Sequence, residues 1–247
     1  MNWESAVSDL ESGDRMGLDI GSRSTKFCTT AGVGVLDTTD FIYSSLWRTI
    51  PSGVDIVTTG YGRKKVPLGR TIPEIRAHTL GALESTGIDN MTLLDIGGQD
   101  FKVVRVDNKA IRDFHMNDKC AAGTGRFLEK MTDVLGMDIK TLGSAEGGRK
   151  IIESTCSVFT ETELISLMME GVSKEELAGG VIHSVYERVR PYLRMFPLDR
   201  IVFTGGVSAC SGLRRTLEVE LEVEVIVPEN AQYMGALGCF LVRSNRP

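Results

Sequence analysis

Two copies of one short pattern decide the fold of this chain: Asp19-Ile20-Gly21-Ser22-Arg23-Ser24-Thr25-Lys26 and Asp95-Ile96-Gly97-Gly98-Gln99-Asp100-Phe101-Lys102. The copies share the aspartate, the isoleucine, the first glycine and the final lysine. Each follows an apolar run and precedes a second run of alternating residues, which predicts a strand, a tight glycine turn and another strand. We therefore expect two similar halves.

Between and after these turns, the sequence predicts a third glycine turn and several helices. Thr204-Gly205-Gly206 follows the apolar run 201–203 and precedes a helical pattern over 213–221. The other expected elements are a helix over 75–85 behind a Thr71/Glu74 capping box, one over 127–135 closed by Gly136, one capped by Ser154 or Thr155 that runs to Gly171, one over 177–194 behind a Ser173/Glu176 box with a kink at Pro191, a strand over 223–227 and a helix over 231–242. Strands mixed with long helices indicate an α/β fold.

The paired glycine turns are suited to binding phosphate. Successive backbone N–H groups in a tight turn form a concave anion site, and glycine leaves it open. Mg²⁺ keeps several waters and takes one or two carboxylates, so we expect Asp19 and Asp95 to hold it through water. Lys26 and Lys102 are expected to supply compensating positive charge. A single such turn is also typical of a plain hairpin, but the matched pair favours a polyphosphate ligand.

Composition excludes several classes of function. The chain has 33 acidic and 28 basic residues, a net charge of -5 and no basic stripe, which argues against nucleic acid as a partner. No apolar stretch approaches the roughly 18 residues of a membrane helix. The first residues are acidic and lack the basic and apolar regions typical of a signal peptide. We therefore expect a cytoplasmic protein with no membrane partner. The five cysteines are widely spaced, contain no Cys-x-x-Cys pair and predict neither a disulfide framework nor a zinc site.

Seven segments together resemble one family of the actin, sugar-kinase and heat-shock-chaperone superfamily. The family is that of the ATP-dependent activators of 2-hydroxyacyl-CoA dehydratases, to which subunits of benzoyl-CoA reductases are related. The segments are GLDIGSRSTK (17–26), TGYGR (59–63), LLDIGGQDFKVV (93–104), MNDKCAAGTGRFLE (116–129), STCSVFTETELIS (154–166), VFTGGV (202–207) and AQYMGALGC (231–239). The resemblance implies two duplicated RNase H-like lobes around a nucleotide cleft, the actin-like ATPase fold. The expected boundaries are 16–88 plus 232–247 for the first lobe and 89–231 for the second; residues 1–15 form an extension without an interpretation.

The resemblance also implies roles for residues of the three turns, with ATP or ADP and Mg²⁺ as cofactors. Asp19, Asp95 and Gln99 are the expected catalytic residues: the aspartates act on Mg²⁺ and Gln99 orients the attacking water. The expected ATP-binding residues are Gly21, Ser22, Arg23, Ser24, Thr25, Lys26, Gly97, Gly98, Gly205, Gly206 and Gln232. Ser208-Ala209-Cys210 depart from the family pattern after the third turn, so the adenosine contacts there stay open.

Two cysteines are assigned by the resemblance to an iron–sulfur cluster. Cys120 and Cys156 are the implied ligands, and a [4Fe–4S] cluster takes four thiolates, so a homodimer with one shared cluster is expected. Both cysteines precede predicted helices, whose positive N-terminal ends stabilise an anionic cluster, and Lys119 and Arg126 add positive charge. We expect Cys28, Cys210 and Cys239 to be buried, the common state of a free cysteine.

The implied function is ATP-dependent transfer of one electron to a 2-hydroxyacyl-CoA dehydratase or related reductase, with a ferredoxin or flavodoxin as donor. The sequence does not identify the donor or the substrate of the partner. Two alternatives are a sugar-type kinase of the same superfamily and an actin-like scaffold that binds ATP without a cluster. Neither alternative gives Cys120 and Cys156 a role.

Overall fold

The structure is a computed structural model that describes residues 1–117, 120–145, 150–154, 156–197 and 199–242. The chain divides into two compact units. Unit 1 comprises Met1–Asp89, Asn108–Ile111 and Pro228–Pro247, and unit 2 comprises Asn90–Asp107 and Arg112–Val227. Among the described residues, no helix is long and apolar enough to span a membrane.

Unit 1 is built on a five-stranded sheet with the strand order β3-β2-β1-β4-β5. Strand β1 pairs antiparallel with β2 and parallel with β4. The elements of unit 1 are α1 (Trp3–Ser8), β1 (Arg15–Ile20), β2 (Ser24–Thr29), β3 (Gly32–Asp37), α2 (Thr38–Tyr43), the 3-10 turn η1 (Leu46–Thr49), β4 (Asp55–Thr59), β5 (Arg70–Thr71), α3 (Glu74–Thr86), η3 (Ala231–Tyr233) and α9 (Met234–Leu241).

The two faces of this sheet are covered by different helices because successive side chains of a strand point to opposite faces. Phe27 of β2 meets Trp3 of α1 edge to face at 5.4 Å, and Trp3 meets Phe41 of α2 at the same distance. On the other face α9 packs so closely on β1 that a Cβ on Gly17 would lie 2.1 Å from the Ala236 carbonyl oxygen. Residues 1–15, which the sequence left without an interpretation, thus contribute α1 to this core.

The capping box predicted for α3 is wrong. The N-cap of α3 is Pro73, which makes no side-chain cap hydrogen bond, and Thr71 lies in β5 opposite Thr58 of β4. The Glu74 carboxylate pairs instead with Arg63 at 3.1 Å. Because Thr71 is committed to the edge of the sheet, it does not reach the helix.

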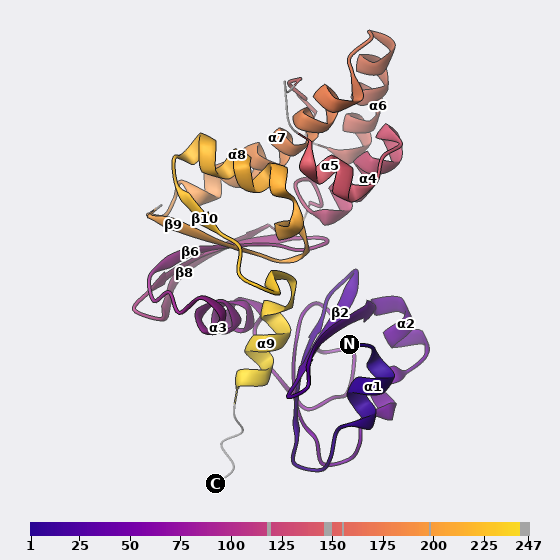
Figure 1. Ribbon diagram of the computed structural model, residues 1–247, viewed down its shortest axis with the longest axis vertical. Coiled ribbons are helices and arrows are strands. Elements are labelled where there is room, and N and C mark those ends of the chain that lie inside the picture. The colour runs from indigo at the N-terminus through magenta and orange to yellow at the C-terminus, as the bar shows by residue number, and fades with distance from the viewer. Residues whose placement is uncertain (118–119, 146–149, 155, 198, 243–247) are drawn as a thin grey trace. The chain divides into compact units, whose positions relative to one another are not determined.

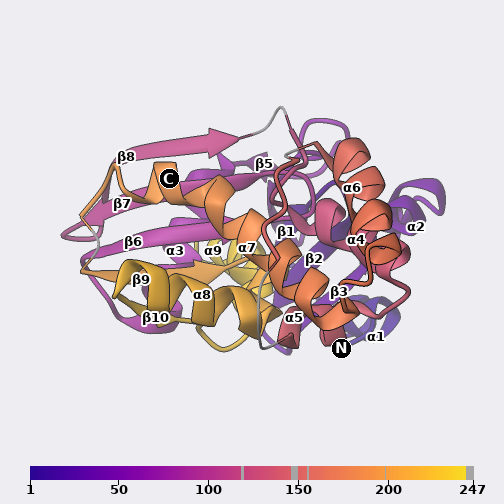
Figure 2. The ribbon, with the colours of Figure 1, turned by 90° about the horizontal axis from the view of Figure 1, so that it is seen from above.

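Unit 2 repeats the sheet with the order β10-β9-β6-β7-β8, and Figure 2 shows these strands side by side. As in unit 1, the first strand of the pattern, β6, pairs antiparallel with the next strand and parallel with a later one, β9. The elements are β6 (Met91–Ile96), β7 (Phe101–Asp107), β8 (Ala110–Asn117), α4 (Gly125–Leu135), α5 (Ile139–Ser144), α6 (Ser157–Met169), α7 (Lys174–Leu193), β9 (Arg200–Thr204), η2 (Gly206–Ala209), α8 (Ser211–Leu221) and β10 (Glu224–Ile226). The predicted α/β class and its duplication are confirmed.

The helices of unit 2 form two groups. Helices α7 and α8 lie along one face of the sheet, and α4, α5 and α6 gather at one end of it (Figures 1 and 2). Two predicted helix ends are confirmed: the Ser173/Glu176 capping box starts α7, and Gly136 ends α4 at φ 60°. Pro191 lies in the last turn of α7.

Candidate functional site

The two aspartate–glycine turns have the same backbone geometry. The Gly21 N–H donates to the Ser24 carbonyl oxygen at 3.2 Å, and the Gly97 N–H donates to the Asp100 carbonyl oxygen at 2.9 Å. A Cβ on Gly21 would lie 2.8 Å from the Ser24 carbonyl oxygen, a separation that real Cβ atoms do not show. Glycine at the start of the first turn is therefore a packing requirement.

The aspartates of the two turns are both buried but have different partners. In unit 1, His78 Nε2 of α3 lies 3.7 Å from Asp19 Oδ2. In unit 2, the Thr204 hydroxyl donates to Asp95 Oδ1 at 2.9 Å, and Lys102 Nζ lies 3.7 Å from Asp95 Oδ2. Lys102 also binds Asp100 at 3.0 Å, so its charge is shared by two carboxylates inside the protein. Asp95 thus faces a lysine side chain, whereas Asp19 faces an imidazole.

The remaining predicted ATP-binding residues of unit 1 differ in how far they are engaged by the protein. Arg23 pairs with Asp37, and the buried Thr25 hydroxyl lies 3.0 Å from that of Thr38. Thr38 in turn donates to the Gly21 carbonyl oxygen at 2.8 Å. The side chains of Ser22, Ser24, Lys26 and Gln232 are half-buried, and Gln232 lies in η3, which contacts β2.

The Gly205-Gly206 turn follows β9. Gly205 has φ 86°, and a Cβ there would lie 2.3 Å from the Ile96 carbonyl oxygen, whereas a Cβ on Gly206 would meet open space. The residues that depart from the family pattern serve the fold: the Ser208 hydroxyl donates to the Gly205 carbonyl oxygen at 2.7 Å, and the Cys210 sulfur accepts from the Leu213 N–H at the start of α8.

The second turn is hydrogen-bonded to the start of α4. The N–H groups of Gly125 and Arg126 donate to the carbonyl oxygens of Gly97 and Gly98, each at 2.9 Å. The hydroxyl of Thr124, a fully buried residue, lies 3.0 Å from the Gly98 carbonyl oxygen and 2.5 Å from that of Ala121. Gln99, predicted to orient water, is exposed in the same turn. The turn is thus joined to the residues that follow Cys120.

Cys28, Cys210 and Cys239 are buried, as predicted, and the other two of the five cysteines are exposed. Burial raises the pKa of the Cys28 thiol to about 11 and raises the pKa of Cys210, so these thiols resist ionisation. Cys239 is also buried, and only Cys120 and Cys156 are exposed. The start predicted for α6 is wrong: its N-cap is Cys156 rather than Ser154, and Thr155 lies outside the described residues.

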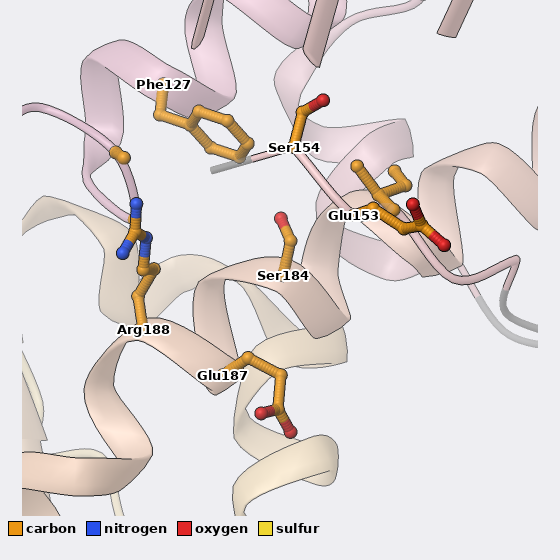
Figure 3. Close-up of a pocket in the computed structure, with 9 residues that line it drawn as sticks. Phe127, Glu153, Ser154, Ser184, Glu187 and Arg188 are labelled. Atoms are coloured by element: carbon orange, nitrogen blue, oxygen red, sulfur yellow. The ribbon is translucent and has the colours of Figure 1, made fainter. Parts of the chain in front are cut away.

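The segments that carry the exposed cysteines share a cavity of about 280 Å³. Ala122 and Gly123 line it from the segment after Cys120, and Glu153 and Ser154 line it from the segment before Cys156. Its floor is α7, from which Ser184 points between Phe127 and Ser154 (Figure 3). Arg126 lies in the first turn of α4, and Lys119 lies outside the described residues. Residues close to both exposed cysteines therefore line one cavity, together with residues of α7.

Three residues of these sites were missed by the sequence analysis. His78 lies beside Asp19 but belongs to none of the quoted segments, whereas Thr124 beside Gly98 and Glu163, which accepts hydrogen bonds ahead of Cys156, lie within quoted segments but were given no role. His78 and Thr124 have partners distant in sequence, and the partners of Glu163 lie nine and ten residues away in a segment without regular structure, so no helix or strand periodicity identifies them.

Comparisons with known proteins agree with this arrangement. The model of the BadF/BadG/BcrA/BcrD ATPase family matches residues 35–242. The (R)-2-hydroxyglutaryl-CoA dehydratase activating ATPase of Acidaminococcus fermentans is 42% identical over 192 residues, which are 75% of this chain and 73% of that protein. The solved activator of the 2-hydroxyisocaproyl-CoA dehydratase from Clostridium difficile, with bound ADPNP, is 34% identical, with a TM-score of 0.83 over 92% of this chain and 93% of that chain.

The fold extends beyond that family. MreB5 of Spiroplasma citri, bound to AMPPNP, is 12% identical with a TM-score of 0.55 over 93% of this chain and 95% of that chain, so it shares the actin-like fold alone. The matched family model covers most of the chain, including the Asp95 turn, both exposed cysteines and the Gly205 turn. This protein has an actin-like α/β fold and belongs to the BadF/BadG/BcrA/BcrD ATPase family.

Proposed function

We propose that this protein is an ATPase that activates a 2-hydroxyacyl-CoA dehydratase, or a related reductase, by donating one electron through a [4Fe–4S] cluster shared by two copies of the chain. The observation that carries the proposal is the pair of exposed cysteines beside helix starts, in a chain whose relatives are named as dehydratase activators. A ferredoxin or flavodoxin is the proposed donor, and the partner's acyl-CoA is left open.

The nucleotide roles follow from the turns. We assign phosphate binding to the backbone of residues 21–26 and 97–98, and nucleoside contacts to Gly205, Gly206 and Gln232. Asp19 and Asp95 hold Mg²⁺ through its waters, and the exposed Gln99 orients the water that attacks the terminal phosphate. The open space beside Gly206 supports its assignment, because backbone there is accessible to a ligand.

The residues present fit a shared cluster. Two thiols of each chain are exposed, and among the described residues there is no group of three or more side chains able to hold a metal. A [4Fe–4S] cluster needs four thiolates, which a twofold pair of chains supplies. Cys156 stands at the N-cap of α6 and makes no cap hydrogen bond, so its sulfur is available at the positive end of a helix. Such a cluster supplies one-electron chemistry.

A chain of hydrogen bonds supports coupling between the nucleotide and Cys120. The carbonyl oxygens of Gly97 and Gly98 accept from Gly125, Arg126 and Thr124, and the Thr124 hydroxyl also lies within hydrogen-bond distance of Ala121, next to Cys120. A change in the conformation of the phosphate turn therefore moves the residues at the start of α4. Hinge movements at such element ends are a common means of switching.

The outer face of α6 carries exposed apolar side chains, and its far end is the proposed docking surface for the dehydratase. Val158, Phe159, Ile165 and Met169 are exposed along it, Met169 to 84%. A second copy that completes the cluster must lie at Cys156, whereas Met169 is 13 residues further on, about 20 Å at 1.5 Å per residue. This distance leaves the far end of the face for the electron acceptor.

Anaerobic purification tests the proposal. The protein should be brown and contain about four irons per dimer, as four-thiolate ligation requires. Cys120→Ala and Cys156→Ala should each lose the iron and retain nucleotide binding, and the buried Cys28→Ala is the matched control that should keep both. A colourless, iron-free wild-type protein that still binds nucleotide would overturn the proposal.

A further inference from the structure

The segment ahead of Cys156 is held by a carboxylate seven residues beyond it. Glu163 of α6 accepts from the Glu153 N–H through Oε1 and from the Ser154 N–H through Oε2, both at 2.8 Å. The described residues 150–154 belong to neither a helix nor a strand, so these N–H groups have no regular partner of their own. One carboxylate thus satisfies two successive backbone donors.

Thr160 binds the carbonyl side of the same segment. This residue is fully buried, and its hydroxyl lies 3.1 Å from the Ser154 carbonyl oxygen and 3.0 Å from that of Cys156. The N–H of Thr160 also donates to the Cys156 carbonyl oxygen at 2.8 Å. Donors and acceptors on both sides of position 155 are therefore tied to the first two turns of α6.

The far end of the segment is anchored to another helix. The Lys150 N–H donates to the Glu176 carbonyl oxygen of α7 at 3.3 Å, and a Cβ on Gly180 would lie 2.2 Å from the Lys150 carbonyl oxygen. The segment is thus hydrogen-bonded to α7 at Lys150 and to Glu163 of α6 at Glu153 and Ser154.

The charge of Glu163 agrees with this geometry. Burial raises the pKa of this carboxyl group, but hydrogen bonds from Ser154 and Glu153 together lower it by a larger amount. The pKa of Glu163 therefore lies below its ordinary value. The group is therefore ionised at neutral pH. Hydrogen bonds to an ionised acceptor are stronger than those between neutral groups.

We propose that Glu163 is a positioning residue for Cys156: its carboxylate, together with the Thr160 hydroxyl, fixes the backbone from which the thiol projects. The inference rests on the proposed function in taking Cys156 as a cluster ligand. A fixed backbone holds the thiolate where the cluster needs it, so that ordering the segment adds no cost when the cluster binds.

The test compares Glu163→Gln with Glu161→Gln. Glu161 lies on the same helix, and its half-buried carboxylate pairs with Lys130 at 3.0 Å. In Glu163→Gln a neutral amide can accept only one of the two N–H groups. We expect hydrogen exchange at residues 153 and 154 to accelerate about tenfold or more, and iron release to bathophenanthroline from the anaerobic protein to accelerate by a similar factor. Glu161→Gln should match wild type in both. Thr160→Val gives a second, independent disruption of the segment and should also release iron faster.

The readouts separate the possible failures. Unchanged amide exchange in Glu163→Gln, or faster exchange with unchanged iron release, would overturn the positioning role while the brown wild-type protein upheld the proposed function. An iron-free wild-type protein would overturn the proposed function itself, and the positioning role with it. Equal unfolding temperatures of the two Glu variants, with faster iron release in Glu163→Gln alone, would support the inference against a general loss of stability.

Discussion

The hydroxyl of Thr124 offers a direct test of coupling between the nucleotide turn and the cysteine segment. It has one proton and two carbonyl acceptors, Gly98 at 3.0 Å and Ala121 at 2.5 Å. Thr124→Val removes the hydroxyl and keeps the branched shape. Both acceptors keep a backbone donor, because Ala121 also accepts from the Thr124 N–H at 3.1 Å and Gly98 from the Arg126 N–H at 2.9 Å. No buried carbonyl is orphaned, so the free energy of unfolding should fall by only about 1 kcal/mol.

The same magnitude bounds the effect on coupling. A link worth about 1 kcal/mol can change an equilibrium between two states by at most about fivefold. We therefore expect the ratio of iron-release rates with Mg-ATP and with Mg-ADP to move toward one, by up to about fivefold, in Thr124→Val. The assay is iron release to a chelator from anaerobic protein saturated with each nucleotide.

Two further variants make the result specific. Thr124→Ser keeps the hydroxyl and should behave as wild type. Thr132→Val removes a hydroxyl from the same helix that donates only within it, to the Glu129 carbonyl oxygen at 2.6 Å, and it should lower stability without changing the ratio. A folded Thr124→Val protein with the wild-type ratio would refute the coupling route.

Three other predictions concern the turns and the docking face. Gly205→Ala should unfold the protein at lower temperature because its Cβ would lie 2.3 Å from the Ile96 carbonyl oxygen at φ 86°, whereas Gly206→Ala should keep its melting temperature and weaken only nucleotide binding, measured by calorimetry. Met169→Asp should leave ATP hydrolysis and iron content unchanged and reduce activation of the dehydratase partner; unaltered activation would remove α6 as the docking surface. Asp19→Asn should raise the Mg²⁺ concentration needed for ATP hydrolysis more than Asp95→Asn does, since Asp95 already faces Lys102; the reverse order in Mg²⁺ titrations would contradict that difference.

The parts of the fold that the sequence predicted are those determined by local chemistry. The strand–turn–strand repeats follow from alternating apolar residues and from a glycine position that has no room for a Cβ atom. The cap of α7 follows from Ser173 and Glu176, three residues apart. Both are visible in fewer than ten consecutive residues. The burial of Cys28, Cys210 and Cys239 was likewise predicted, whereas the assignment of Cys120 and Cys156 came from the family resemblance.

Two helix starts were mispredicted because other contacts engage the residues expected to cap them. Thr71 has the right spacing to Glu74, but its backbone is paired to β4 across the sheet. Ser154 is a good N-cap residue by type, but its N–H is bound by Glu163 and its carbonyl oxygen by Thr160, and the N-cap of α6 is Cys156. The partner of Thr71 is a separate strand, and the partners of Ser154 lie six and nine residues further along, so the three-residue spacing of a capping box identifies neither.

The duplicated turns share backbone and register but differ in what surrounds them, and that difference bears on function. Asp19 lies opposite Lys26 and Thr59 in the sheet, and Asp95 lies opposite Lys102 and Thr204. Thr204 donates to Asp95, whereas Thr59 donates to the Ile72 carbonyl oxygen and leaves Asp19 to His78. Asp95 therefore has a lysine side chain at 3.7 Å and Asp19 has an imidazole at 3.7 Å, so the two aspartates offer a cation different surroundings.

The carbonyl groups of the two turns differ in the same way. The Gly21 carbonyl oxygen accepts from Thr38, at the start of α2 in its own unit. The Gly97 and Gly98 carbonyl oxygens accept from α4, the helix that follows Cys120. Only the second of these links leads toward an exposed cysteine. Duplication therefore supplied two similar aspartate–glycine turns, and the helix attached to the second one gives that turn its own route to the proposed electron-transfer site.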